Sequence, residues 1–232
     1  MKYPVYLTII LLLLTMSPPI HANLGSSAGG GIAQQQPVKR QTPEEKALVS
    51  FQRGLKHRDK AARFEQKAVD EKNEKKYAKL QKKIGKEYRK AIDDYEKAIG
   101  YYPMLYQAHS SLGYALRKVN RYEESLAAYD QSLEINPFYH DAIEYRGEAY
   151  LGLNRLDDAK AAYMELFQDN RPLADQLMAA MIAWVAARRD DTGGLDASVV
   201  DQFAEWVDQR NTLASYIHPI HDTAGNRWSG SD

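Results

Sequence analysis

The chain of 232 residues contains no cysteine. Without a thiol it can form no disulfide framework, no zinc site with thiolate ligands and no iron–sulfur cluster. A cysteine nucleophile and a lipidated N-terminal cysteine are excluded for the same reason. This absence does not identify a compartment, because many exported proteins also lack cysteine.

The chain also lacks net charge, since 31 Lys and Arg residues balance 31 Asp and Glu residues. Charged residues make up 27% and hydrophobic residues 44% of the chain, as in an ordinary globular protein. This composition excludes a collagen-like, disordered or polytopic membrane protein over most of its length. Phenylalanine is scarce, with five residues against sixteen tyrosines, and this excess of tyrosine is the main compositional anomaly.

The chain has one long hydrophobic run, from Val5 to Met16. A membrane-spanning helix needs about 20 apolar residues, which this run does not reach. Lys2 precedes it, Pro18 and Pro19 follow it, and Ala22 offers a small residue for cleavage, an order typical of a secretory signal. We therefore expect a signal peptide at residues 1–22 and export, to the periplasm in a bacterium. A retained membrane anchor is the alternative.

A period of 34 residues runs through the middle of the chain. One column of this period contains Tyr95, Tyr129 and Tyr163, and five further columns of small, apolar, glycine, asparagine and proline residues stay in phase with it. A fixed period of 20–50 residues is the mark of a stacked repeat. Each unit has two helical segments, and proline ends the second, as at Pro137, because it lacks an N–H and disfavours helix before it.

These residues resemble the tetratricopeptide repeat. The best-matching unit has the Leu112–Gly113 pair, Leu116, Tyr129 and Pro137 in the expected columns. The next unit follows the pattern with departures where Arg146 and Leu166 stand. The resemblance implies an all-α solenoid of antiparallel helix pairs, in which each hairpin buries its apolar face on the next.

The first unit is longer than the others. Gly54 and Gly113 are 59 residues apart, which is 25 more than one period. We interpret the excess as two lengthened helices, at about 43–70 and 75–100, that form an antiparallel prong projecting from the solenoid. After the repeats, two apolar segments at 173–187 and about 195–215 predict a capping helix pair.

The expected organisation therefore has seven segments. They are a signal peptide (1–22), a flexible linker (23–42), an elongated divergent first hairpin (43–103), two tetratricopeptide units (104–139 and 140–172), a C-terminal capping hairpin (173–216) and a flexible tail (217–232).

Neutrality conceals an uneven distribution of charge. Residues 51–90 contain 15 Lys and Arg against 6 Asp and Glu, whereas residues 121–232 contain 9 against 20. One interpretation is a solvated helical face. The others are a docking arm for anionic envelope material and head-to-tail self-association, and both would weaken in salt.

Metal and catalytic motifs are scarce. The segment His218-Pro219-Ile220-His221-Asp222 has the look of a metal site, but it lies in a predicted loop and its two histidines have no further ligands converging on them, so no metal is expected. His140 and Glu144 have the i, i+4 spacing of an ordinary surface pair. No nucleophile elbow, P-loop or dinucleotide fingerprint is present, so we expect neither enzymatic activity nor a cofactor.

What the resemblance implies instead is a concave groove lined by the first helix of each unit. The positions that line it are Gln107, Ser110, Tyr114, Arg117, Lys118, Asp141, Glu144, Glu148, Leu151 and Gly152. Some members of the family grip a carboxylate with Lys and Asn at two of these positions. This chain has Ser110 and Tyr114 there, so that clamp is not expected.

We therefore predict an adaptor or assembly factor of the cell envelope that binds a segment of another protein in this groove, anchored by Tyr114. Nucleic acid and small-molecule substrates are not expected partners, and a homodimer through the cap or Trp206 is an alternative assembly. The rival hypothesis is a structural or self-associating envelope protein that acts through the basic prong on anionic surfaces.

Overall fold

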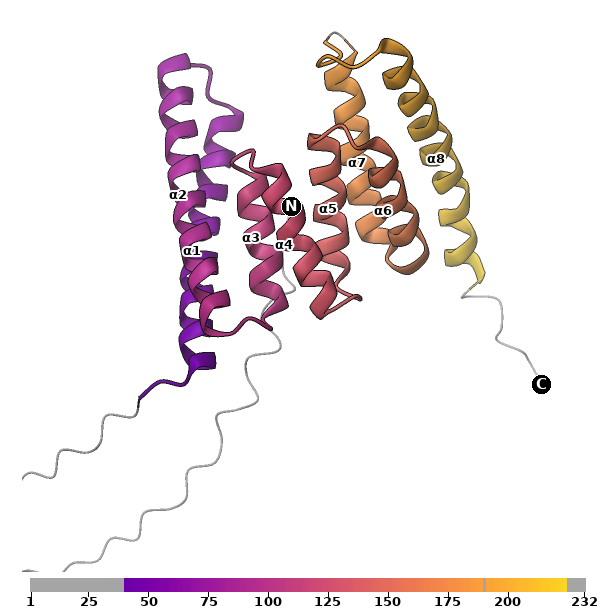
Figure 1. The fold of residues 1–232 in the computed structure, drawn as a ribbon. Coiled ribbons are helices and arrows are strands. Elements are labelled where there is room, and N and C mark those ends of the chain that lie inside the picture. The colour runs from indigo at the N-terminus through magenta and orange to yellow at the C-terminus, as the bar shows by residue number, and fades with distance from the viewer. Residues whose placement is uncertain (1–39, 190, 225–232) are drawn as a thin grey trace, which may run out of the picture. The chain divides into compact units, whose positions relative to one another are not determined.

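The computed structural model describes residues 40–189 and 191–224, and these residues form eight α-helices and no β-strand (Figure 1). The helices are α1 (Pro43–Val69), α2 (Glu74–Tyr101), α3 (Tyr106–Arg117), α4 (Tyr122–Ile135), α5 (His140–Gly152), α6 (Leu156–Asp169), α7 (Arg171–Arg188) and α8 (Ala197–Ala224). Each helix packs against the next along the chain, and α5 also contacts α3 and α7. The predicted all-α solenoid is therefore confirmed, whereas the predicted signal peptide and linker residues 23–39 lie outside the described residues.

The first hairpin begins at a well-defined cap. The Thr42 hydroxyl accepts a hydrogen bond from the backbone N–H of Glu45 at 3.2 Å, and the Glu45 carboxylate accepts one from the Thr42 N–H at 3.0 Å. This reciprocal pair satisfies two N–H groups that a helix start leaves open, and Pro43 occupies the first turn, where no N–H is needed. The predicted long helices are present, because α1 has 27 residues and α2 has 28.

Glycine allows the two helices of a hairpin to approach closely. A Cβ on Gly113 would lie 2.6 Å from the ring of Tyr129, and one on Gly54 would lie 2.4 Å from the ring of Tyr95. Both rings are fully buried. The first hairpin therefore uses the same glycine–tyrosine contact as the second, which confirms Gly54 as the glycine of its first helix.

The turns between paired helices depend on asparagine. Asn120 between α3 and α4 has a φ of 63°, and Asn154 between α5 and α6 has a φ of 57°. Asparagine adopts this left-handed conformation more readily than other residues that carry a Cβ. The 34-residue spacing of the two asparagines thus reflects a turn geometry that both repeats share.

Replacing Asn120 with valine should lower the free energy of unfolding by about 1–2 kcal/mol, because a β-branched residue is strained at this φ. Replacement with glycine should have little effect, since glycine adopts positive φ freely. Urea denaturation of the two variants checks this expectation. Equal destabilisation by valine and glycine would show that the asparagine side chain, and not the backbone conformation, is what matters.

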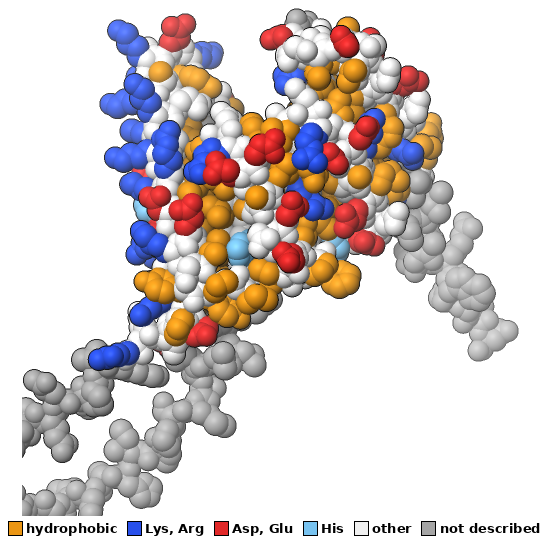
Figure 2. All heavy atoms as spheres, in the orientation of Figure 1, with side chains coloured by type: hydrophobic (Ala, Val, Ile, Leu, Met, Phe, Trp, Pro, Cys, Tyr) orange, Lys and Arg blue, Asp and Glu red, His pale blue; other side chains and the backbone are white. Residues whose placement is uncertain are grey.

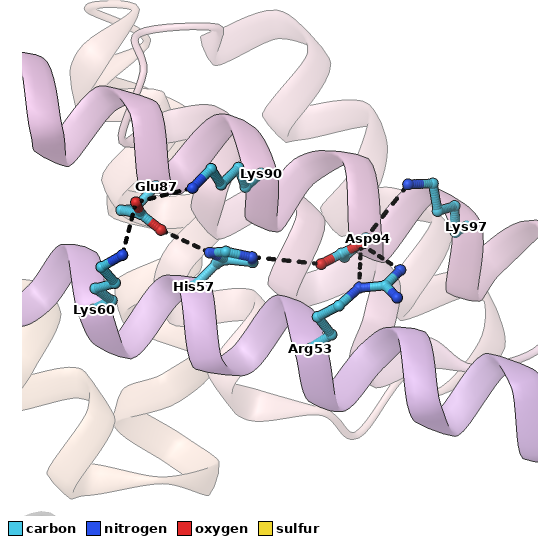
Figure 3. A network of polar contacts seen from close by, with 7 residues as sticks. All are labelled: Arg53, His57, Lys60, Glu87, Lys90, Asp94 and Lys97. Carbon is cyan, nitrogen blue, oxygen red and sulfur yellow. Dashed lines mark hydrogen bonds and ion pairs between the residues drawn. The ribbon is translucent and has the colours of Figure 1, made fainter.

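The seam between α1 and α2 is held by a polar network (Figure 3). Two buried carboxylates of α2, Glu87 and Asp94, face three side chains of α1. Arg53 donates to Asp94 at 2.8 Å, His57 Nδ1 lies 2.7 Å from Glu87, and Lys60 pairs with Glu87 at 3.2 Å. Lys90 and Lys97 complete the network from α2. Burial alone would raise the pKa of Glu87, but hydrogen bonds from His57 and the two lysines outweigh it and bring the pKa to about 2.

The last two helices pack in sequence order, with α7 on α5 and α6, and α8 on α7. Helix α8 extends further than predicted. The sequence suggested a loose tail from residue 217 because proline interrupts helical hydrogen bonding, yet α8 passes Pro219 and ends at Ala224. The expected loop around His218 and His221 is therefore wrong, because both residues are in a helix. Within the described residues, no helix is long and apolar enough to cross a membrane.

Candidate partner-binding site

The sequence-predicted groove residues lie on α3 and α5 or directly after α3, on adjacent first helices of two repeats. They separate into two groups by burial. Those that remain partly exposed are Gln107, Tyr114, Arg117, Lys118, Asp141 and Glu148, and Gly152 is exposed. Those that are buried are Ser110, Glu144 and Leu151, with exposed fractions of 2%, 2% and 4%.

Tyr114 lies at the centre of the partly exposed group. Its ring centroid is 5.2 Å from that of Tyr145 on α5, in an edge-to-face arrangement, and 6.1 Å from that of Tyr88 on α2. These distances are within the range of favourable aromatic pairs. Tyr114 therefore connects three successive hairpins and has little freedom to move.

Two cations lie over these rings. The guanidinium of Arg117 is 5.4 Å from the Tyr114 centroid and 5.9 Å from that of Tyr145, and it forms an ion pair with Glu148 of α5. The ammonium of Lys118 is 5.8 Å from the Tyr114 centroid and 2.8 Å from a carboxylate oxygen of Glu65 on α1. Each cation is thus paired with a carboxylate from a different helix. The site is therefore a partly exposed cluster in which cations and carboxylates alternate next to tyrosine rings.

The predicted contact role of Ser110 and Leu151 requires correction, because neither side chain reaches solvent. Leu151 belongs to the core cluster that includes residues of α7, and its carbonyl accepts a hydrogen bond from the indole N–H of Trp184 at 2.9 Å. Helix α5 packs against both α3 and α7. Ser110 and Leu151, which the family pattern places in an open groove, therefore lie at contacts between helices.

Glu144 is the largest departure from expectation. It is not part of a surface pair with His140, because it is 2% exposed. Burial and the negative charge of Glu148 raise its pKa, Arg117 opposes them, and the net result is a pKa of about 8. Glu144 is therefore largely protonated at neutral pH.

Sequence reasoning also missed several members of the site. Glu65, Tyr88 and Tyr145 come from three helices and join the cluster only through folding. One feature of the sequence does indicate the acidic pair, since Glu144 and Glu148 are spaced i, i+4 and so share a helix face. As to metals, no group of three or more His, Asp or Glu residues in the part of the chain that the structure describes could hold an ion.

Residues 106–139, which contain α3 and α4, match the family model of the tetratricopeptide repeat. This segment is therefore similar to a tetratricopeptide repeat, and stacked helix pairs lie on either side of it. The matched segment corresponds to one full period of the repeat seen in the sequence.

Solved structures with a similar helical arrangement include the first tetratricopeptide domain of human RPAP3. The two sequences are 21% identical, the alignment covers 64% of this chain and 98% of the RPAP3 domain, and the TM-score is 0.45. The first such domain of Spaghetti (RPAP3), bound to the HSP90 peptide SRMEEVD, is 23% identical over 61% and 95% of the two chains, with a TM-score of 0.43. MamA is 17% identical in an alignment that covers 81% of this chain and 99% of MamA, also with a TM-score of 0.43. A comparison with curated proteins gave no match.

Proposed function

We propose that the protein is a non-enzymatic interaction adaptor or assembly factor that binds a segment of another protein on the face formed by α3 and α5. The proposal includes export to the cell envelope, which rests on the N-terminal features of the sequence. The observation that carries it is the cluster around Tyr114, where aromatic rings and two cations remain partly exposed. Tyrosine and arginine are the residue types that most often dominate binding energy at protein interfaces.

The cluster favours a partner segment that carries carboxylates beside an apolar side chain. Lys118 has three N–H donors and, within the described residues, one ionic partner, Glu65, so it can donate to a further carboxylate. The tyrosine rings next to it supply apolar contact area. Because Glu65 and Glu148 already neutralise the two cations, a partner carboxylate competes with them, and we expect moderate affinity that falls as salt concentration rises.

Replacing Lys118 with glutamate should reduce partner binding by at least about tenfold, which is the scale of an interface hot spot. The measurement is quantitative crosslinking capture from an envelope extract, read by mass spectrometry. The double variant Lys118→Glu/Glu65→Lys restores the internal ion pair with reversed positions. If Lys118 contacts the partner, the double variant should not recover binding.

Arg189→Glu serves as the matched control, since Arg189 is exposed at the end of α7 and the substitution changes the charge by the same amount. It should leave capture unchanged. Recovery of binding in the double variant would mean that the ion pair acts only by stabilising the fold. Wild-type capture by all three variants would rule out the α3–α5 face as the binding site.

A further inference from the structure

Helix α2 carries a row of cations along one side. Lys75, Lys79, Lys82, Lys86 and Arg89 are spaced 4-3-4-3, which places them on one helix face. All five are exposed, and none of them pairs with a carboxylate of the residues that the structure describes. At 1.5 Å per residue the row is about 21 Å long. The fifteen residues from Lys75 to Arg89 thus present positive charge without an intervening carboxylate on that face.

Helix α1 carries a second row. Lys56, Lys60, Arg63 and Lys67 are spaced 4-3-4 and are all exposed. The space-filling view shows Lys and Arg side chains gathered over this first hairpin, while Asp and Glu are spread over the helices that follow (Figure 2). The uneven charge seen in the sequence therefore becomes a surface feature of α1 and α2.

The seam between the two helices of the hairpin also carries cations. Lys60 of the α1 row and Lys90 of α2 both pair with the same oxygen of Glu87 at 3.2 Å. Glu87 and Asp94 are themselves buried, and among the nine cations of the two rows only Lys60 pairs with one of them (Figure 3). We call the surface formed by the two rows the basic face.

The chemistry of the basic face favours one kind of partner. Seven of its nine cations are lysines, and only Arg63 and Arg89 are arginines. Arginine is the residue suited to bidentate pairing with individual carboxylates of a protein partner, whereas lysine is a flexible point charge. A straight row of lysines suits a surface with many dispersed negative charges, because each lysine then adds separately to the binding energy.

We propose that the basic face docks the α1–α2 hairpin on an anionic lipid surface. This site is separate from the α3–α5 face and does not depend on the proposed function. Each lysine near such a surface contributes a factor of about five to affinity. Tyr101 at the end of α2 is exposed, with Lys46 over its ring at 5.7 Å, and adds to the same hairpin an amphipathic side chain suited to the headgroup region.

The test is cosedimentation of the full-length chain with vesicles of phosphatidylcholine, with and without phosphatidylglycerol, at low and high salt. The variant Lys79→Gln/Lys82→Gln/Lys86→Gln removes three charges from the basic face. The control Ala127→Glu/Gln168→Glu/Gln202→Glu changes the net charge by the same amount at exposed positions on α4, α6 and α8. Circular dichroism verifies that both variants keep their helices.

We expect binding only to the anionic vesicles, a loss of roughly 100-fold in affinity for the glutamine variant, and near wild-type affinity for the control. Equal weakening of both variants would overturn the proposal, because net charge alone would then explain binding. Binding to neutral vesicles that the glutamine variant retains would overturn it in favour of an apolar segment. A salt-sensitive oligomer without vesicle binding would make a second copy of the chain the occupant of the basic face.

Discussion

Replacing Tyr129 with alanine should lower the free energy of unfolding by about 3–5 kcal/mol, the usual cost of truncating a fully buried aromatic residue. The ring of Tyr129 is fully buried, lies directly over Gly113 of α3, and is 6.3 Å from the ring of Tyr145 on α5. Its removal would leave a cavity that the backbones of α3 and α4 are already too close to fill by small shifts. Both the hairpin and its contact with the next repeat should loosen.

Urea denaturation followed by circular dichroism measures this loss, and thermal unfolding should show a fall in Tm of about 10 °C or more. Tyr77→Ala is the matched control, because Tyr77 on α2 is 46% exposed and its truncation leaves no cavity. We expect the control to lie within about 1 kcal/mol of the wild type. A similar loss for the two variants would mean that Tyr129 contributes no more than helix propensity.

The fold was predictable because its determinants recur along the sequence. The column of Tyr95, Tyr129 and Tyr163 marks the buried centre of three hairpins, and all three side chains are buried in the structure. Close helix approach needs a residue without a Cβ opposite the ring, so Gly54 and Gly113 could be assigned to equivalent places. These glycine–tyrosine contacts form between residues of one repeat unit, so the residues that make them recur at the period of the repeat.

The candidate site was less predictable because it depends on contacts between units. Position within the repeat correctly placed Tyr114, Arg117 and Lys118 on a partly exposed face. It could not show that Leu151 is covered by α7, nor that Lys118 pairs with Glu65 on a helix more than fifty residues earlier. Ion pairs between helices depend on the angle at which those helices pack, which the residue pattern of one helix does not contain.

Glu87 and Glu144 show how the surroundings of a buried carboxylate change its pKa. Glu87 is buried but receives hydrogen bonds from one histidine and two lysines, which bring its pKa to about 2. Glu144 is buried beside another carboxylate, and its pKa rises to about 8. Both residues are glutamates on helices, so composition and spacing alone would assign them the same ordinary pKa of 4.5. The charged side chains around each carboxylate decide whether its pKa falls or rises.

Replacing Glu144 with glutamine should therefore stabilise the protein at alkaline pH. The pKa of Glu144 in the folded state, about 8, is above its ordinary value of 4.5, so the folded protein holds a proton that the unfolded chain releases between these two values. Its contribution to stability is fully present below pH 4.5 and is lost as the pH rises through 8. Glutamine stays neutral at every pH, so the variant should escape this loss, with a gain on the order of 2–4 kcal/mol above pH 8.

Unfolding free energies of the two proteins, measured from pH 4 to 9, should thus diverge between pH 4.5 and about 8 and keep a constant difference above that. Glu87 does not affect the comparison. Because its pKa is lowered, its contribution to protein stability is lost only as pH falls from 4.5 toward 2, and this loss is the same in both proteins. Glu165→Gln on the exposed side of α6 is the matched control and should follow the wild type. Parallel curves for the Glu144 variant and the wild type would show that Glu144 is ionised in the folded state, with Arg117 rather than a proton neutralising it.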